Sequence, residues 1–264
     1  MKNFIDCHAH LDDEAFDQNR QQIIDSLADD DVEFVINCGS DLQTSKNSLE
    51  LAKNFDNIFC VLGCHPHEAK FFDLDTQNFL SQNATHPKVL AIGEIGLDYH
   101  YDLSLREVQR SVFEKQIILA DKLGLPIVIH TREAWGDTLD ILAKNKSYLN
   151  NGVLFHCFNG SAETTKILID KYDAYFSLGG AITFKNFKGF DTIKQIPITR
   201  ILTETDCPYM TPVPFRGQTN TPKNVAIVAK RLAEEFDLDT SDFCQTVRQN
   251  TLRLFPKLKN FFNV

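Results

Sequence analysis

The sequence of 264 residues lacks any apolar run of about 18 residues, the length that a transmembrane helix needs. It also lacks a linker rich in Pro, Gly or Ser, a block of like charges and an internal repeat, so nothing divides the chain. Residues 1–14 carry acids where a secretory signal peptide has its apolar core. These absences predict one domain over residues 1–264, located in the cytoplasm and without a membrane partner.

Cysteine motifs that hold structural zinc are missing as well. The seven cysteines form an odd set, and most lie in apolar, strand-like runs, which indicates reduced thiols. Cys60 and Cys64 are near one another, but no second pair follows at zinc-finger spacing. We therefore expect both to be small buried side chains.

The chain has no excess of basic residues. It contains 27 Lys and Arg against 36 Asp and Glu, a formal net charge of −9. Non-specific wrapping of long nucleic acid requires a basic face, so this charge argues against that class of function. A local binding site for a polyanion is still compatible with this charge, because bound divalent cations supply positive charge themselves.

What the sequence does contain is a series of eight short apolar runs rich in Val, Ile and Phe. The runs are nearly continuous rather than alternating, which is typical of parallel strands buried on both faces. Eight such units with helices between them predict an α/β fold, a (β/α)8 TIM-type barrel whose site lies at the carboxyl ends of the strands. A doubly wound open sheet is the alternative. The runs are residues 4–7, 33–38, 58–64, 89–96, 126–131, 152–157, 174–180 and 200–206.

The clearest helical periodicity covers residues 105–123, where apolar side chains beginning with Leu105 recur at three, four or seven positions. Ser104 and Glu107 have the spacing of a capping box at the start of this helix. Gly124 predicts its C-terminal cap. This segment is therefore expected to be an amphipathic helix between two strands.

Histidines and acids recur at the ends of the predicted strands. The stretch FIDCHAHL ends in two imidazoles two positions apart, which leave the same face of an extended chain. Any single residue of this kind is more often a hydrogen-bonded core histidine or a helix-capping acid. Their recurrence at one end of the strands predicts a site for two divalent metal ions, and the mixed ligands suit Zn²⁺, Mn²⁺ or Mg²⁺. The candidate ligands are His8, His10, Glu94, His130, His156 and Asp206.

A separate physical argument supports a role for each of three acids. Glu94 lies inside the apolar stretch AIGEIG, where an ionised carboxylate is costly unless it is paired or binds metal. Gly93 and Gly96 beside it either leave space for metal or substrate or permit close packing. Glu204 and Asp206 face the same way, and a cation beside Asp206 removes their repulsion. We expect Asp206 to be both ligand and general base, with Glu204 orienting or sharing its proton network.

Six segments in order, over nearly the whole chain, resemble the signature segments of the TatD family of metal-dependent deoxyribonucleases. They are DCHAHL, GCHPH, AIGEIGLDY, GLPIVIHTREA, FHCFNGS and ILTETDCPYMTP. The resemblance implies a TIM-type barrel, a divalent-metal centre that uses Mg²⁺, and hydrolysis of phosphodiester bonds in DNA. It also implies one metal held by His8, His10 and Asp206, a second held by His130 and His156, and a bridge formed by Glu94.

The chain departs from this family at one motif. Where the family commonly has Asn-Glu-Pro, this sequence has Asn220, Thr221 and Pro222. Thr221 is a good N-cap before a proline, so we expect the following helix to begin there all the same. Whatever the family's Glu contributes near the site is missing here.

Four residues of the matched segments are candidates for contact with substrate. His65 follows strand three, whereas His67 is expected at the surface. His100 lies in the loop after strand four, and Arg132 and Arg216 are placed to bind phosphate. The expected reaction is exonucleolytic hydrolysis of short or terminal DNA segments by a metal-activated water, without an obligate protein partner.

Three other functions fit parts of the same pattern. A barrel amidohydrolase acting on an amide or ester also begins with His-x-His, but it commonly bridges its metals with a carboxylated lysine on strand four, and only Lys88 lies near that strand. A deacylase of aminoacylated tRNA could use the same residues. A non-enzymatic metal-binding scaffold would show no metal-dependent turnover.

Overall fold

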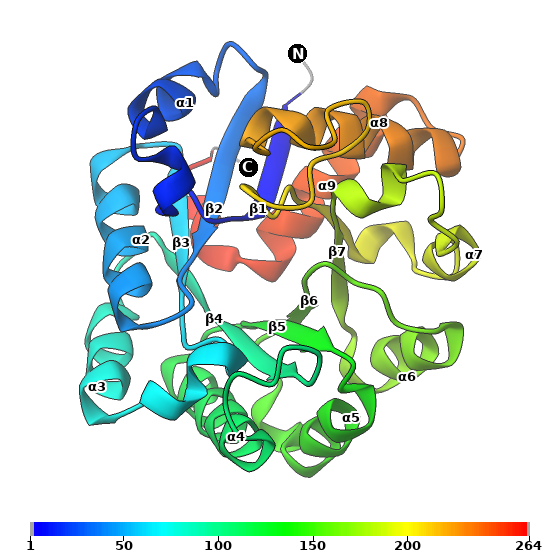
Figure 1. Cartoon of the computed structure of the whole chain (residues 1–264). Helices are drawn as coiled ribbons and strands as arrows, with labels where there is room; N and C mark the ends of the chain where they lie inside the picture. Colours follow the sequence, from blue (N-terminus) through cyan, green and yellow to red (C-terminus); the bar gives the residue numbers. More distant parts are fainter. Residues whose placement is uncertain (1–2, 263–264) are drawn as a thin grey trace.

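The computed structural model describes residues 3–262, in which eight parallel strands form a barrel surrounded by helices (Figure 1). Each strand pairs with its successor in the chain, and each overlaps one of the predicted apolar runs. The predicted TIM-type barrel is therefore confirmed, and the doubly wound sheet is excluded. The strands are β1 (Phe4–Ala9), β2 (Val32–Cys38), β3 (Ile58–Leu62), β4 (Val89–Asp98), β5 (Ile127–Arg132), β6 (Val153–Phe155), β7 (Tyr175–Leu178) and β8 (Ile201–Thr203).

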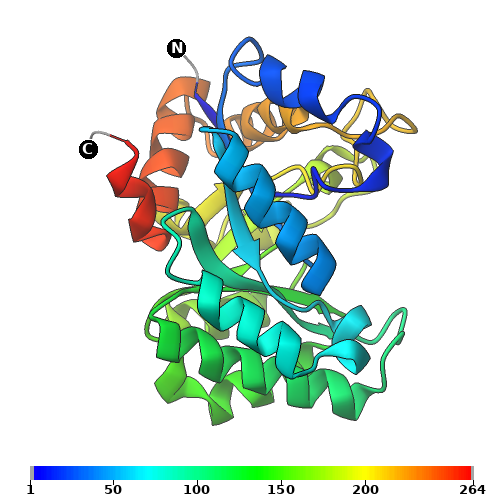
Figure 2. The same cartoon turned by 90° about the vertical axis from the view of Figure 1, so that its left-hand side faces the viewer.

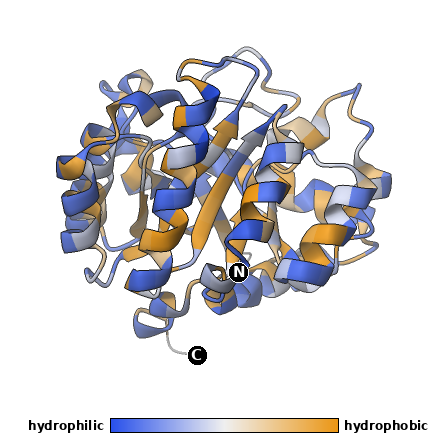
Figure 3. Cartoon of the chain, turned by 90° about the horizontal axis from the view of Figure 1, so that it is seen from below, coloured by the Kyte–Doolittle hydropathy of each residue, from blue (hydrophilic) through white to orange (hydrophobic). Residues whose placement is uncertain are grey.

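Helices cover the outside of the barrel, with their apolar faces toward the strands and their polar faces outward (Figures 2 and 3). Among the described residues, no helix has the length and apolar character required to cross a bilayer. The helices are α1 (Arg20–Ser26), α2 (Leu42–Asn54), α3 (Leu74–Asn83), α4 (Arg106–Leu123), α5 (Trp135–Lys144), α6 (Ala162–Tyr172), α7 (Phe190–Ile193), α8 (Val225–Glu235) and α9 (Thr240–Leu254).

The amino-terminal half of the barrel interior is apolar. All eight strands contribute to one buried cluster, which includes Phe34 and Phe59 from the beginnings of β2 and β3. Phe255 and Leu258, which follow α9, join this cluster and cover the amino ends of the strands. Burial of this apolar surface stabilises the barrel at one end and leaves the opposite end for polar side chains.

The barrel closes between β8 and β1 without a regular strand ladder among the described residues. Hydrogen bonds close this seam instead. The hydroxyl of Thr203 donates to the carbonyl of Ile5 at 2.7 Å, and the backbone N–H of Thr205 donates to Asp6 Oδ1 at 2.9 Å. Farther along, the Asp206 N–H donates to the carbonyl of His8 at 2.9 Å. Side chains thus do part of the work of backbone pairing at this seam.

Helix α4 begins differently from the prediction. Leu105 occupies its N-cap position, and no side chain caps the helix, so the predicted capping box is wrong. The hydroxyl of Ser104 donates to the carbonyl of His67 at 2.7 Å and accepts the N–H of Lys70, so it serves the neighbouring loop. Leu105 is 68% exposed rather than on the inner face. Gly124 ends the helix at φ 66°, as predicted.

Two buried glutamines of α4 hold the ends of neighbouring strands. Gln116 accepts the N–H of Cys64 at 2.8 Å and donates to its carbonyl at 2.9 Å. Gln109 makes the same pair of bonds with Asp98, at 2.9 and 3.1 Å. Each glutamine therefore makes the two backbone hydrogen bonds that a neighbouring strand would make at that residue. Through these bonds α4 fixes the chain just beyond β3 and at the end of β4.

Candidate metal centre

Six predicted ligand residues converge at the carboxyl end of the barrel, and Glu94 of β4 lies at their centre. Its Oε2 atom is 3.2 Å from His8 Nε2 and 3.8 Å from His10 Nε2. Its Oε1 atom faces the other way, 2.9 Å from His130 Nδ1 and 2.7 Å from His156 Nε2. One carboxylate thus presents each oxygen to a different pair of imidazoles.

Asp206 completes the group around His8 and His10. Its Oδ1 atom lies 3.5 Å from His10 Nε2 and 3.9 Å from His8 Nε2, and its side chain is 16% exposed. Ligand atoms of these three residues lie within 4.8 Å of one another, as do those of His8, Glu94 and His156. Both sets have the spacing needed to surround a divalent cation.

Two imidazole nitrogens of this cluster have no hydrogen-bond partner, which is unusual for buried polar atoms. Among the described residues, His8 Nε2 and His156 Nδ1 are buried in this way. His8 is fully buried, and this burial lowers the pKa of its imidazole to about 4, so the ring is neutral and its Nε2 faces two carboxylates. A nitrogen and oxygen set of this kind fits a divalent metal ion.

The carboxylates of the cluster are ionised. Burial alone would raise the pKa of Glu94, but the imidazoles of His156, His65 and His8 hold it well below its usual range. Burial opposes ionisation of Asp206 too, and the hydrogen bond with His10 lowers its pKa nevertheless. The cluster therefore combines negative charge with imidazole nitrogens.

Cys38 of β2 orients both imidazoles at the carboxyl end of β1. The Nδ1 atom of His10 donates to its backbone carbonyl at 2.9 Å, and the Nδ1 atom of His8 lies 3.4 Å from its thiol. Because Nδ1 is occupied in each ring, Nε2 is the nitrogen turned toward Glu94 and Asp206. Nothing in the sequence singled out this cysteine.

His65 also reaches the cluster, with its Nε2 atom 3.5 Å from Glu94 Oε1. Its ligand atoms group with those of Glu94 and His130. However, its Nδ1 accepts the backbone N–H of His67 at 3.2 Å, so the neutral ring carries its proton on Nε2. His65 is consequently placed as a hydrogen-bond donor toward the cluster.

Asp98 is a member of the site that sequence reasoning missed. It is only 1% exposed at the end of β4, and its Oδ2 atom lies 3.0 Å from His130 Nε2 and 3.1 Å from His67 Nε2. Burial would raise its pKa, but the hydrogen bond with His130 and the nearby imidazole of His67 hold it well below its usual range. A signal was present in the sequence, because residues 94, 96 and 98 share one face of an extended strand. His67 is thus half-buried against Asp98. The sequence had predicted a surface position for it instead.

Glu204 lies behind the cluster, and its carboxylate is not one of the groups that face the cluster's centre. It is fully buried, accepts the backbone N–H of Cys157 at 2.7 Å and accepts the hydroxyl of Ser177. Its Oε2 atom lies 3.9 Å from His156 Nδ1. Burial raises the pKa of Glu204 to about 7. Its surroundings suit a group that orients His156 better than one that contacts a reacting atom.

The residues predicted to contact substrate differ in whether their side chains are already paired with other residues. Arg132 lies over the ring of Tyr101, 4.8 Å from its centroid, and its guanidinium has no hydrogen-bond or ion-pair partner among the described residues. Tyr101 in turn packs edge-on against His67 beside the cluster. His100 instead pairs at 2.8 Å with Glu133, which lies in the loop after β5.

Arg216 is engaged by two residues that do not belong to the cluster. Its guanidinium lies 4.0 Å from the centroid of the Phe184 ring, and Nη1 donates to the carbonyl of Thr211 at 3.4 Å.

Thr221, expected to cap the next helix, has a buried hydroxyl without a hydrogen-bond partner among the described residues. The helix start nevertheless forms at Pro222, as a short 3₁₀ turn (Pro222–Asn224) that leads into α8.

The glycines beside Glu94 serve close packing. A Cβ atom on Gly93 would lie 2.8 Å from the Cβ of Val128, and one on Gly96 would lie 2.0 Å from the carbonyl oxygen of His130. Gly96 also has φ 140°, which side chains rarely adopt. Between the two interpretations that the sequence allowed, packing against β5 is the one that the structure supports.

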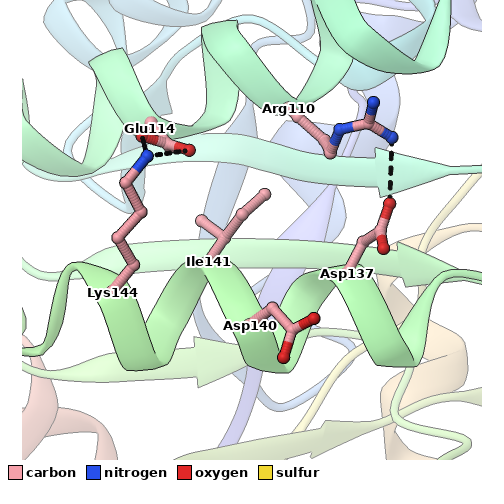
Figure 4. Close-up of a pocket in the computed structure, with 6 residues that line it drawn as sticks. All are labelled: Arg110, Glu114, Asp137, Asp140, Ile141 and Lys144. Carbon is pink, nitrogen blue, oxygen red and sulfur yellow. Dashed lines mark hydrogen bonds and ion pairs between the residues drawn. The ribbon is translucent and has the colours of Figure 1, made fainter.

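Other candidate groups lie outside the cluster. Lys88 Nζ donates to the carbonyls of Ala52 and Phe55 at the end of α2, so it is not placed to bridge metals. Cys60 and Cys64 are buried, and no cysteine belongs to a potential metal-binding group in the part of the chain that the structure describes. A surface hollow between α4 and α5 contains the ion pairs Arg110–Asp137 and Lys144–Glu114 (Figure 4).

With this geometry in place, comparison with known proteins decides the family. The family model described as "TatD related DNase" matches residues 5–256. The chain belongs to the TatD family. The resemblance of its sequence segments is thereby confirmed.

Relatives of this TatD chain match it over almost its full length. It is 38% identical over 252 residues to an uncharacterised metal-dependent hydrolase, YabD, of Bacillus subtilis, covering 95% of this chain and 98% of that protein. The uncharacterised metal-dependent hydrolase YcfH of Escherichia coli is 34% identical over 256 residues, covering 95% of each chain. The crystal structure of YjjV, a TatD homologue from E. coli, superimposes with a TM-score of 0.89 at 28% identity, covering 96% of this chain and 98% of YjjV.

Proposed function

We propose that this TatD protein is a metal-dependent hydrolase that cleaves phosphodiester bonds in DNA from an end, with residues 1–264 forming one such domain. The observation that carries the proposal is Glu94, whose two oxygens face two separate sets of imidazoles. A shared carboxylate of this kind suits two cations a short distance apart. The DNase family model and the names of the relatives, which are metal-dependent hydrolases, support the same reaction class.

Each metal position has its own residues in this proposal. His8, His10 and Asp206 would hold one divalent cation, Zn²⁺, Mn²⁺ or Mg²⁺, and His130 and His156 the second, with Glu94 shared. Bound there, the two cations would lower the pKa of a water molecule and neutralise charge on the phosphoryl group.

The protein's own residues perform the proton transfer and the binding. Asp206 is partly open to solvent and accepts the proton of the attacking water at its carboxylate. Glu204, buried behind His156, keeps that imidazole in place. His65 donates its Nε2–H to a phosphoryl oxygen, because its other nitrogen already accepts a backbone hydrogen bond.

Charge around the cluster favours binding at a DNA end. The segment after β1 contains Asp12, Asp13 and Glu14, next to His10, and an acidic segment repels a continuing phosphate backbone. Arg132 lies at the end of β5, which is opposite β1 in an eight-stranded barrel. A strand held by Arg132 therefore ends at the cluster. His100 and Arg216 have a weaker claim to substrate contact, because both are engaged locally.

The proposal is tested by a substrate panel with purified protein. End-labelled linear DNA, closed circular DNA, RNA and an aminoacyl ester are each incubated with Mg²⁺, Mn²⁺ or Zn²⁺, or with excess chelator. We expect stepwise release of nucleotides from linear DNA in the presence of metal and none in chelator. Equal cleavage of circular DNA would refute attack from an end, and ester hydrolysis without DNA cleavage would refute the nuclease assignment in favour of a deacylase.

A further inference from the structure

We infer that Asp98 is a positioning residue that fixes the orientation and tautomer of His130. This inference rests on the proposed metal centre, because it concerns which nitrogen of His130 is offered to a cation. His130 Nδ1 faces Glu94 Oε1 at 2.9 Å and His156 Nε2 at 3.1 Å, whereas its Nε2 faces Asp98 Oδ2 at 3.0 Å.

The surroundings of Asp98 determine the direction of this hydrogen bond. Its Oδ1 accepts two backbone N–H groups and its Oδ2 faces the imidazole of His130, so the carboxylate accepts and His130 Nε2 carries the proton that it donates to Oδ2. The neutral ring then has its lone pair on Nδ1, the atom that points into the cluster. A carboxylate that accepts from the second nitrogen of a metal-binding histidine also makes the ligating nitrogen more basic.

The carboxylate of Asp98 is itself held rigidly. Its Oδ1 atom accepts the backbone N–H groups of His100 and Tyr101, each at 2.9 Å, and its own backbone is held on both sides by Gln109. Oδ2 is therefore left to the imidazoles of His130 and His67. Because its position is fixed by main-chain contacts, Asp98 can impose an orientation on His130 instead of following it.

The two metal positions differ in this respect. Cys38 orients His8 and His10 through a neutral thiol and a carbonyl, whereas a full negative charge orients His130. Loss of that charge should therefore weaken metal binding at the position of His130 and His156 and leave the position of His8 and His10 nearly unchanged. A residue needed only for folding would affect both positions alike.

The wild-type protein provides the first test. In ¹⁵N-labelled protein without metal, at a pH above the titration of His130, we expect NMR to show its proton on Nε2. Addition of Zn²⁺ should then shift the Nδ1 resonance and leave the Nε2 proton in place. A proton on Nδ1, or Zn²⁺ on Nε2, would overturn the inference even if the enzyme hydrolyses DNA. Failure of the nuclease assay alone would leave this result standing.

The second test compares Asp98→Asn with Asp137→Asn, a rim acid outside the cluster that pairs with Tyr99 and Arg110. Calorimetric titration of Zn²⁺ into Asp98→Asn should show one site near wild-type affinity and the other weakened about 10- to 100-fold. Asp98→Glu restores the charge and should recover part of the loss. Equal weakening of both sites, or the same effect from Asp137→Asn, contradicts a positioning role.

Discussion

The seam between β8 and β1 offers a quantitative test of the fold through Asp6. This side chain is fully buried, and burial raises its pKa from 3.8 to about 8, so the folded protein holds the proton at neutral pH. In the unfolded chain the same group is ionised above pH 4. The folded state consequently loses stability as the pH rises from 3.8 toward 8, and gains it back as the pH falls.

The size of this effect follows from the shift. Each pKa unit corresponds to about 1.4 kcal/mol, so at pH 7 retention of the proton costs the folded state about 4 kcal/mol. Asp6→Asn removes the cost and keeps the contacts of the protonated acid. The amide oxygen can accept the N–H of Thr205, and the amide nitrogen can donate to the Thr205 hydroxyl.

Urea denaturation of both proteins in chelator, at several pH values between 4.5 and 8, measures the difference. Near pH 4.5 the difference should shrink to about 1 kcal/mol, which makes this point the internal control. At pH 7 Asp6→Asn should be more stable by about 4 kcal/mol. A variant less stable than wild type at pH 7, or a difference independent of pH, would show that Asp6 is not a protonated buried acid.

Three further predictions concern the metal centre and the substrate. Glu94→Gln should weaken metal binding at both positions and His156→Ala at one only, as measured by elemental analysis; two metals retained by Glu94→Gln at unchanged affinity would exclude a bridge. Asp206→Asn should lower kcat by about 10² to 10⁴ at saturating metal, with Glu204→Gln affected less; the reverse order in steady-state assays would contradict the assigned roles. Arg132→Ala should raise KM for DNA about tenfold and leave KM for bis(4-nitrophenyl) phosphate unchanged, whereas equal effects on both substrates would place Arg132 outside the flanking contacts.

Much of the fold could be predicted from the sequence, because buried parallel strands leave continuous apolar runs that are easy to find. Five of the six residues proposed as ligands were found for the same reason, since each lies at or just beyond the end of such a run, and Glu94 was found because it is a carboxylate inside one. The end of α4 was also predictable, because Gly124 marks a left-handed cap. Its beginning was not, because Ser104 has the right spacing for a capping box but is used by an adjacent loop.

The features that the sequence did not predict depend on contacts between segments that are far apart in the chain. Asp98 and Cys38 orient imidazoles from other strands, and nothing local in the sequence shows those partners. Gln109 was also hidden, because a buried glutamine looks like part of an exposed helical face until its two backbone partners are known. Thr221 misled in the opposite direction: its residue type favours a cap, but its hydroxyl is buried without a partner.

The paired glutamines of α4 have a consequence for motion. Gln116 holds the chain that leads to His65, and Gln109 holds Asp98 and the loop of Tyr101 that follows it. Two loops from different strands are thus attached to one helix and should fluctuate as one body. Opening of the site then has to come from the opposite side of the rim, where residues 213–219 are exposed. Hydrogen exchange should accordingly be slow at both glutamine-bound strand ends and fast in that segment.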